Sequence, residues 1–592
     1  MSDDPTRPIA TPSGPQMDVR AAAEPIAAEP IAAEPMAPAA TTAAGGNRTR
    51  WAIAFVVAGL AIALTFVVVL LFGQQAAPTA LQYVPGDAAV VAEIRLDLPG
   101  DQLQRLGNLL GHFPGFADQS TLRAKLDEAL TKFVSSASKG KASYATDLKP
   151  WVNGPLFIAA LNPSDNLAGD RLKDTIISAT TNGAVACAAV FKDQTVTHET
   201  YKALDLVLSA DGAMGCVVDG HQALLGDPAT VKKALDAKAA GSGMDKSAEY
   251  KAARTALGGD RLATVYMNGA SLTKLMPSPS SMPVPGLQGL IGGLPSWLMA
   301  GVRAEDDAFV LDYVAAPVPA ATGGPSLLPV PAVHASVVAP MVPGDTLVFV
   351  EQQGAGVSLQ NLLTQLRQIP DVANALKLLD GVGGAGELVG WVDDVGMTVS
   401  MHGTSPDAAV LLVAKDEAAA TSRVASLKTL LALVGSSNGV EVKSSTIDGA
   451  AVTTVTITDL GALVPQGTVP GVSNLPTGPI SFSIAARGKV LLVTSGEGAM
   501  KAILETAAGT SLADNAAFKH VGLRGLADAR TTVYASVGAS VDLFKGFLTA
   551  DQLATYQKDG APYVKPFEGF LFQATSDAAG NRLRMVITVS QP

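Results

Sequence analysis

Three kinds of short motif could mark catalytic chemistry, but none has the flanking elements that its chemistry needs. Residues 381–386 fit the Gly-x-Gly-x-x-Gly dinucleotide pattern, which must follow a strand and open a helix so that the helix N-terminus meets the pyrophosphate. Here the pattern follows a helix-like segment and precedes a strand-like one. Residues 435–439 fit the Gly-x-Ser-x-Gly nucleophile elbow in the same reversed context, and residues 136–139 and 271–274 fit Ser-x-x-Lys without a Lys-Thr-Gly element. We therefore predict no nucleophilic or dinucleotide site.

Metal-binding and paired-acid chemistry have equally little support in the spacing. No histidine stands at metal-ligand spacing from another, and His-Glu-x-x-His is absent. The histidines are His112, His198, His221, His334, His402 and His520. Asp393–Asp394 is poorly placed for acid-base work because successive side chains of a strand point to opposite faces, and Asp306–Asp307 fits a hairpin turn. We predict no catalytic residue, no metal and no cofactor.

Cys187 and Cys216 are the two cysteines, and each lies in an apolar, strand-like stretch. If the surrounding domain faces an oxidising compartment, a disulfide between them would close a loop of roughly 30 residues and contribute about 3–4 kcal/mol. The alternative is a pair of small buried side chains without a bond, since free cysteine often behaves as a hydrophobe. Both interpretations stay open.

One uncharged apolar segment, from Trp51 to Phe72, has the length of a transmembrane helix. Its 22 residues would span roughly 33 Å, against a hydrocarbon core of about 30 Å. Arg48 and Arg50 precede it directly and no charge follows it closely, so we expect residues 1–50 in the cytoplasm and residues 73–592 outside the cytoplasmic membrane. The lipid bilayer is the predicted partner of this segment. The Ala/Pro-rich tail before it is predicted to be disordered.

The composition argues against a general nucleic-acid binder. Only 16% of the residues are charged and the net charge is −11, which leaves no general basic surface to displace counterions from phosphates. The 48% hydrophobic content is ample for sizeable cores.

Several sequence anchors recur in the same order along the chain. They pair Tyr83–Asp87 with Met341–Asp345, Trp151-Val152 with Trp391-Val392, Tyr250-Lys251 with Phe518-Lys519, and Thr264–Tyr266 with Thr532–Tyr534. Such self-similarity indicates a duplication. We infer two homologous units, residues 81–318 and 338–592, joined by a Pro/Gly-rich linker at residues 319–337.

Each unit alternates short strands with short amphipathic helices, which predicts an α+β fold. We expect a mostly antiparallel or mixed sheet in each unit, with the helices packed on one face. Residues 443–458 read as a hairpin turning at Asp448-Gly449, without a clear equivalent in the first unit. The stretch around Cys187 in the first unit matches the stretch around Val410 in the second. Each is predicted to be a strand that is followed by a helix.

Two long, uncharged, Pro-punctuated loops could contact lipid or a partner, or cover a ligand. They are residues 275–295 and 463–479. Loops of this length are often functional, and exposed apolar stretches can mark a contact surface. The candidate contact residues are Met276, Met282, Leu287, Leu290 and Ile291. The alternative is a loop folded over its own domain core.

The opening sequence YVPGDAAVVAEIRLDLPGDQLQRLGNLLGHFPGFAD resembles the start of a bacterial family catalogued as domain of unknown function 3352. The segments LLGDPATVKKALD and DRLATVYMNGASL fit the same family, and the resemblance covers essentially residues 81–592. It implies a bacterial, membrane-anchored, exported protein. It implies no activity, cofactor or catalytic residue.

These observations favour a non-enzymatic cell-envelope protein whose duplicated exported domain binds or scaffolds an envelope protein, glycan or lipid. One alternative is a carrier or sensor of an apolar ligand such as a lipid. Another is an enzyme whose site is dispersed along the sequence.

Overall fold

The computed structural model describes most of the chain from residue 79 onward. The described ranges are 79–95, 100–116, 118–137, 143–161, 173–181, 185–191, 194–271, 295–318, 331–367, 389–402, 405–435, 440–458, 479–577 and 579–590, with single residues at 373, 376 and 386. All of them fall within one compact unit, residues 59–592. Within these ranges no helix combines the length and apolarity needed to cross a membrane, and the predicted segment 51–72 lies outside them.

Strands provide the frame of the described residues. The earlier strands are β1 (Val90–Ile94), β2 (Val152–Ala160), β3 (Thr175–Thr181), β4 (Val196–Tyr201), β5 (Leu204–Ser209), β6 (Gly215–Asp219), β7 (Gln222–Gly226), β8 (Ala263–Asn268), β9 (Trp297–Glu305) and β10 (Ala308–Ala315). The later strands are β11 (Val348–Gln352), β12 (Val392–His402), β13 (Ser405–Ala414), β14 (Val440–Ile447), β15 (Ala450–Ile457), β16 (Ile480–Arg487), β17 (Val490–Thr494), β18 (Thr531–Ser536), β19 (Phe567–Asp577) and β20 (Gly580–Val589).

Short helices connect the strands. They are α2 (Gly100–Gly111), α3 (Leu122–Ala137), α4 (Val185–Val190), α5 (Pro228–Ala240), α6 (Ala248–Leu257), α8 (Ala355–Leu366), α11 (Glu417–Gly435), α13 (Glu497–Leu504), α14 (Ala516–Gly522), α15 (Val537–Lys545), α16 (Ala550–Thr555) and α17 (Ala561–Val564). The predicted α+β class is therefore confirmed.

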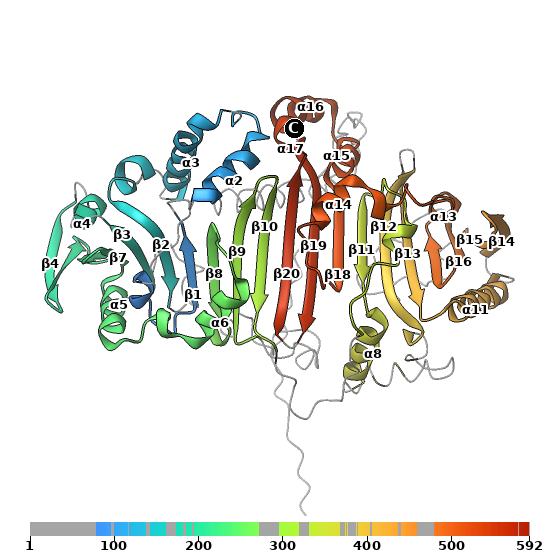
Figure 1. Ribbon diagram of the computed structural model, residues 1–592, viewed down its shortest axis with the longest axis horizontal. Helices are drawn as coiled ribbons and strands as arrows, with labels where there is room; N and C mark the ends of the chain where they lie inside the picture. Colours follow the sequence, from blue (N-terminus) through green and yellow to red (C-terminus); the bar gives the residue numbers. More distant parts are fainter. Residues whose placement is uncertain are drawn as a thin grey trace, which may run out of the picture. The chain divides into compact units, whose positions relative to one another are not determined.

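All of these strands belong to one sheet, and every described strand pair is antiparallel. The earlier strands follow the spatial order β4-β5-β6-β7-β3-β2-β1-β8-β9-β10. The later strands follow the order β14-β15-β16-β17-β13-β12-β11-β18-β19-β20. The pairing of β10 with β20 joins the two sets, as Figure 1 shows.

Two predicted hairpins are confirmed, and two details of the sequence reading are wrong. Asp306–Asp307 forms the turn between β9 and β10, and Asp448–Gly449 forms the turn between β14 and β15 with φ values of +46° and +75°. A hairpin of β4 and β5 does occupy the place beside β6 that β15 and β14 take beside β16. Cys187 lies in the helix α4 and not in a strand. The strand that pairs with β2 and β7, as β13 pairs with β12 and β17, is β3, which precedes that helix.

Apolar side chains form a separate core on each side of the seam between β10 and β20. One core contains Val91, Phe157, Leu224, Tyr266 and Met299, all nearly inaccessible to solvent. The other contains Phe349, Leu411, Leu492, Met500 and Tyr534. A third cluster packs α2 and α3 against the strands at the seam, through Leu106, Leu109, Leu126, Phe309 and Val589.

Buried charges cross the same seam. Asp312 on β10 forms ion pairs with Arg303 on β9, with Arg261 at 3.1 Å, and with Arg584 on β20 at 2.6 Å. Burial lowers the pKa of the Arg261 guanidinium to about 10, although Asp312 opposes that change. Asp307 in the β9–β10 turn contacts His520 at 2.9 Å and also Arg524, both from the later part of the chain. The seam is therefore held by charge pairs as well as by strand hydrogen bonds.

Candidate functional site

A buried carboxylate on β11 lies near the one cluster in the described residues that could hold a metal ion. Glu351 is 3% exposed and lies between β12 and β18. Ser336 Oγ donates a hydrogen bond to Glu351 Oε1 at 2.9 Å. Burial raises the pKa of Glu351 above its ordinary value, and the nearby Asp394 carboxylate adds to the increase.

The second carboxylate is held at a β-bulge at the start of β12. The register moves from Val392 opposite Ala414 to Asp394 opposite Val413, so Asp393 is the extra residue of the bulge. A bulge interrupts the alternation of a strand and re-aims its side chains. Each aspartate consequently has an oxygen within 4.8 Å of the other's and of a His334 nitrogen, contrary to the expectation that adjacent strand residues must diverge.

Asp394 is fully buried, and its two oxygens have different surroundings. Oδ1 accepts a hydrogen bond of 2.9 Å from the backbone N–H of Gly354, which takes a left-handed φ of +65° directly before α8. Oδ2 has no hydrogen-bond partner. Burial raises the pKa of Asp394, partly offset by the Gly354 hydrogen bond. The start of α8 lies against the bulge, since a Cβ on Gly356 would come within 1.9 Å of Val392 O.

The histidine of the cluster comes from the segment 331–336, which has no regular secondary structure. Gln353 holds the backbone of His334 in both directions, accepting from its N–H at 3.0 Å and donating to its carbonyl at 2.8 Å. His334 Nδ1 lies 2.9 Å from the carbonyl oxygen of Ala335, which can only accept, so Nδ1 is the donor. His334 Nε2 then points at Asp394 Oδ2, 3.2 Å away.

Together, His334, Asp393 and Asp394 place one ligand atom each within 4.8 Å of one another. Imidazole nitrogen and carboxylate oxygen are ligands of divalent transition metals, so these residues could hold such an ion. Sequence spacing could not find this set, because His334 lies in the segment assigned to the linker and 59 positions before Asp393. The signals near it were the adjacent acids Asp393–Asp394 themselves and the Trp391-Val392 anchor that immediately precedes them.

The corresponding place on β1 is built differently. Glu93 is also buried, but Arg95 and Arg254 pair with it at 2.9 and 3.2 Å. The strand β2 also has an irregular register after Val152, and the residues there are Asn153 and Gly154 instead of two aspartates. Arginine thus balances the buried acid in the earlier half, where the later half has a histidine and more carboxylates.

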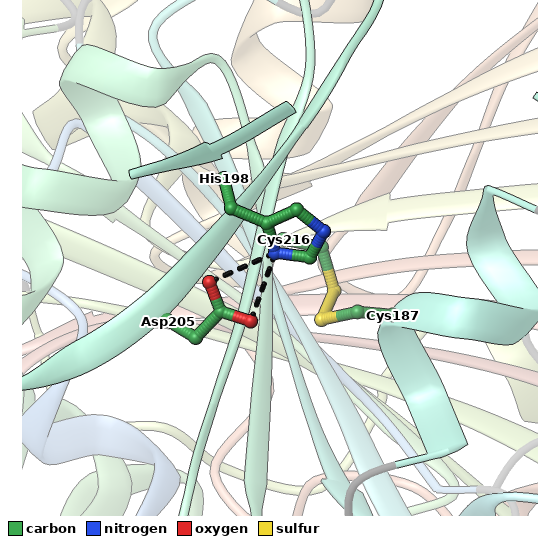
Figure 2. The surroundings of a disulfide bond; sticks show 4 residues. All are labelled: Cys187, His198, Asp205 and Cys216. Carbon is green, nitrogen blue, oxygen red and sulfur yellow. Dashed lines mark hydrogen bonds and ion pairs between the residues drawn. A yellow bond between two sulfur atoms is a disulfide. The ribbon is translucent and has the colours of Figure 1, made fainter. Parts of the chain in front are cut away.

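The cysteines form a disulfide, with a Cα–Cα distance of 5.5 Å. Figure 2 shows the bond between Cys187 on α4 and Cys216 on β6. Near it His198 Nδ1 contacts both carboxylate oxygens of Asp205 at 3.0 Å, and both side chains are largely exposed. The bond fastens α4 to the β4–β7 end of the sheet.

A pocket of about 470 Å³ lies elsewhere in the later half, between β12, β13 and α13. Met401 and Ile503 line it together with the acidic residues Asp345, Asp407 and Glu505. The metal-ligand cluster is not part of this lining.

The remaining sequence-predicted positions lie partly or wholly outside the described residues. Met276, Met282, Leu287, Leu290 and Ile291 all do, as do residues 463–478 of the second loop. The Gly-x-Ser-x-Gly match begins at Gly435, which ends α11, and is followed by Val440, which begins β14. Residues 436–439 lie outside the described residues. The elements on its two sides are in the helix-to-strand order that argues against a nucleophile elbow.

The described residues thus form an antiparallel sheet with connecting helices and one cluster of candidate metal ligands. Residues 51–585 match the family described as "Protein of unknown function (DUF3352)", and the chain belongs to that family. The resemblance seen in the opening sequence is thus confirmed.

No curated protein matches the chain. Crystal forms I and IV of TP0453 are similar at 8% and 10% sequence identity, with TM-scores of 0.22 and 0.21. The matches cover 41% and 40% of this chain and 80% and 83% of those chains. Likenesses with such low TM-scores carry no argument about function.

Proposed function

We propose that this chain is a single-pass, membrane-anchored protein of the bacterial cell envelope, with a non-enzymatic binding or scaffold domain outside the cytoplasmic membrane. In this proposal residues 1–50 are a cytoplasmic tail, residues 51–72 span the bilayer and residues 73–592 are exported. The observation that carries it is the Cys187–Cys216 disulfide. Disulfides persist in oxidising compartments outside the cytoplasm and are rare inside it, so the bond agrees with the orientation expected from Arg48 and Arg50.

Thiol labelling tests the orientation without any engineered residue, because the chain has only two cysteines. Intact spheroplasts would be treated with a membrane-impermeant maleimide, with and without a membrane-impermeant reductant. The reaction would be quenched before the cells are denatured. We expect labelling only after reduction. Labelling that needs lysis of the spheroplasts, and then occurs without reductant, would reverse the proposed topology.

We further propose that the two sets of ten described strands are copies of one ancestral unit. The strand orders given above correspond position by position, with β1 between β2 and β8 and β11 between β12 and β18. The backbone pairing of Pro85 with Gly243 recurs as that of Pro343 with Ser511.

An aromatic contact supports the same proposal. Tyr250 and Tyr266 pack edge to face with ring centroids 5.2 Å apart. Phe518 and Tyr534 do the same at 5.0 Å, from helices and strands in the corresponding places. These four residues are among the sequence anchors, so the recurrence in sequence coincides with a recurrence in packing.

A binding role is supported by large apolar side chains that remain in solvent. Leu523, Phe547 and Tyr563 are 83%, 64% and 52% exposed, in or beside the helices α14, α15 and α17. Exposed apolar side chains that form a contiguous patch often mark a surface that binds a partner. The pocket of about 470 Å³ gives the apolar-carrier alternative less support, because three acidic residues are among those that line it.

Site-specific photo-crosslinking in living cells tests the binding role. A photoreactive amino acid at Phe547 is expected to give a discrete adduct in the envelope fraction. The same amino acid at the exposed Lys443 on β14 serves as the matched control. Adducts of equal intensity at both positions, or none at Phe547, would argue against a specific partner surface there.

A further inference from the structure

We propose that His334, Asp393 and Asp394 bind one divalent first-row transition-metal ion, of the kind represented by Zn²⁺. The proposal is independent of the membrane topology and of the scaffold role proposed above. It rests on the geometry of the three side chains, on the charge buried around them and on the contrast with the earlier half of the chain.

The distance between the two innermost ligand atoms is the first argument. His334 Nε2 and Asp394 Oδ2 lie 3.2 Å apart, but Oδ2 has no hydrogen-bond partner. Two atoms that each lie about 2.1 Å from one ion are separated by roughly 3.0–3.4 Å in octahedral or tetrahedral coordination. The pair therefore has the spacing of two ligands of one ion, although its geometry does not make a hydrogen bond.

The hydrogen bond on the far side of the imidazole is the second argument. Because His334 Nδ1 donates to the carbonyl of Ala335, the neutral ring carries its lone pair on Nε2, the atom that faces the aspartates. A backbone carbonyl behind a metal-binding histidine is the usual device that fixes the ring and its tautomer. Gln353 fixes the backbone of the same residue from both sides. The histidine is thus oriented before any ion arrives.

The buried charge is the third argument. Glu351 and Asp394 are both almost inaccessible, and within the described residues neither has an ion pair with lysine or arginine. Burying a carboxylate without a compensating cation is costly. Asp393 adds a third carboxylate that is only partly buried and gives the site an opening to solvent. A divalent cation would balance this charge.

The earlier half supplies an internal comparison. The buried Glu93 is neutralised there by Arg95 and Arg254. In the later half Gln353 follows Glu351 by the two positions that separate Arg95 from Glu93, and no arginine replaces it. One half therefore contains its own cations, and the other has the ligands for an external one.

The ion would have a structural consequence. His334 belongs to the segment that enters the later strands from residues 319–330, whereas the aspartates belong to the bulge of β12. A bound ion would fasten this incoming segment to the sheet beside the start of α8. Imidazole nitrogen in the ligand set favours Zn²⁺ or a similar ion over Mg²⁺ and Ca²⁺, which prefer oxygen ligands.

Calorimetric titration of Zn²⁺ into the metal-free, full-length chain in detergent micelles tests the proposal. We expect one ion per chain with the wild type, and affinity at least roughly 100-fold weaker with His334→Gln and with Asp394→Asn, since removing a ligand costs more than removing its supporting group. A tenfold excess of Mg²⁺ should not displace the Zn²⁺. Asn at position 394 keeps an acceptor for the Gly354 N–H, so the variant retains the hydrogen bond that begins α8.

His198→Gln is the matched control, because it removes an exposed His–Asp pair outside the cluster. It should leave the stoichiometry and affinity unchanged. If Asp394→Asn fails to fold, Asp393→Asn removes a ligand at a less buried position and is read in the same way. Absence of binding by the wild type, unchanged affinity in His334→Gln, an equal loss in His198→Gln, or displacement by Mg²⁺ would each overturn the proposal.

Discussion

Glu93 and Glu351 stand at the same register in two strands that pair in the same way: Glu93 lies opposite Thr264 across β1 and β8, and Glu351 lies opposite Thr532 across β11 and β18. Both carboxylates are buried. Their surroundings differ, since arginines pair with the first while a serine, a histidine and a second acid lie near the second. The buried charge is therefore compensated differently at these two positions of the sheet. Arginines neutralise Glu93, whereas the residues around Glu351 include side chains that could bind an ion.

Gln353 is expected to control metal affinity without touching the ion. Gln353→Ala removes both hydrogen bonds to the backbone of His334, so the imidazole loses its preset position. Loss of such a supporting group typically costs 10–100-fold in metal affinity, and we expect a decrease within about that range in Zn²⁺ titration. Gln557→Ala, at an exposed position, is the control. An unchanged affinity in Gln353→Ala would show that His334 needs no such support.

Asp312 is expected to be essential for stability because three arginines surround it. In Asp312→Ala the buried Arg261 and the partly buried Arg584 lose their carboxylate partner, and Arg303 keeps only its ion pair with Glu305. Breaking a buried ion pair by removing one partner costs about 3–5 kcal/mol, and urea unfolding of the full chain measures it. Asp205→Ala, which removes an exposed carboxylate, should stay within about 0.5 kcal/mol of the wild type. Equal effects of the two substitutions would contradict this account of the seam.

Asp307 is expected to make stability depend on pH in the acid range. Burial opposes its ionisation, but hydrogen bonds and charges of His520 and Arg524 outweigh that effect and lower its pKa in the folded chain. In the unfolded chain the pKa is about 3.9. A folded pKa below the unfolded one means that the contribution is present above about pH 4 and is lost as the pH falls through the folded value.

The measurement is the free energy of unfolding of the wild type and of Asp307→Asn at several pH values from about 5 to about 3. The wild type should lose stability more steeply than the variant over this range. Identical slopes would mean that the contacts to His520 and Arg524 do not favour the ionised carboxylate.

Reduction of the disulfide is expected to destabilise the fold measurably. The bond joins residues 29 positions apart, for which the chain-entropy model gives about 3–4 kcal/mol. The double variant Cys187→Ala/Cys216→Ala should show a comparable decrease in the free energy of unfolding and no further response to reductant. A wild type whose stability is the same with and without reductant would contradict this prediction.

Local patterns in the sequence predicted the class of the fold and two hairpins, but not the strand pairing that joins the earlier and later strands into one sheet. The turns at Asp306–Asp307 and Asp448–Gly449 follow from polar and glycine residues between alternating strands. The pairing of β10 with β20 joins residues such as Val310 and Val586, and nothing in either strand specifies a partner so far away. The helix around Cys187 was read as a strand, because a short apolar run cannot be assigned by periodicity alone.

The candidate metal cluster could not be predicted for a related reason. The argument that Asp393 and Asp394 face opposite ways holds for a regular strand, and the bulge at that point removes its premise. His334 lies in a segment whose sequence is typical of a linker, and hydrogen bonds from Gln353 fix its backbone near the aspartates. Both features depend on tertiary contacts, which spacing along the chain does not encode.

The most direct test of the metal site is a crystal structure of the full-length chain grown with Zn²⁺, with diffraction data collected on both sides of the zinc absorption edge. The account predicts an anomalous peak, present only above the edge, that lies within bonding distance of His334 Nε2 and of oxygens of Asp393 and Asp394. Zinc peaks elsewhere on the chain, with none between these three side chains, would contradict it.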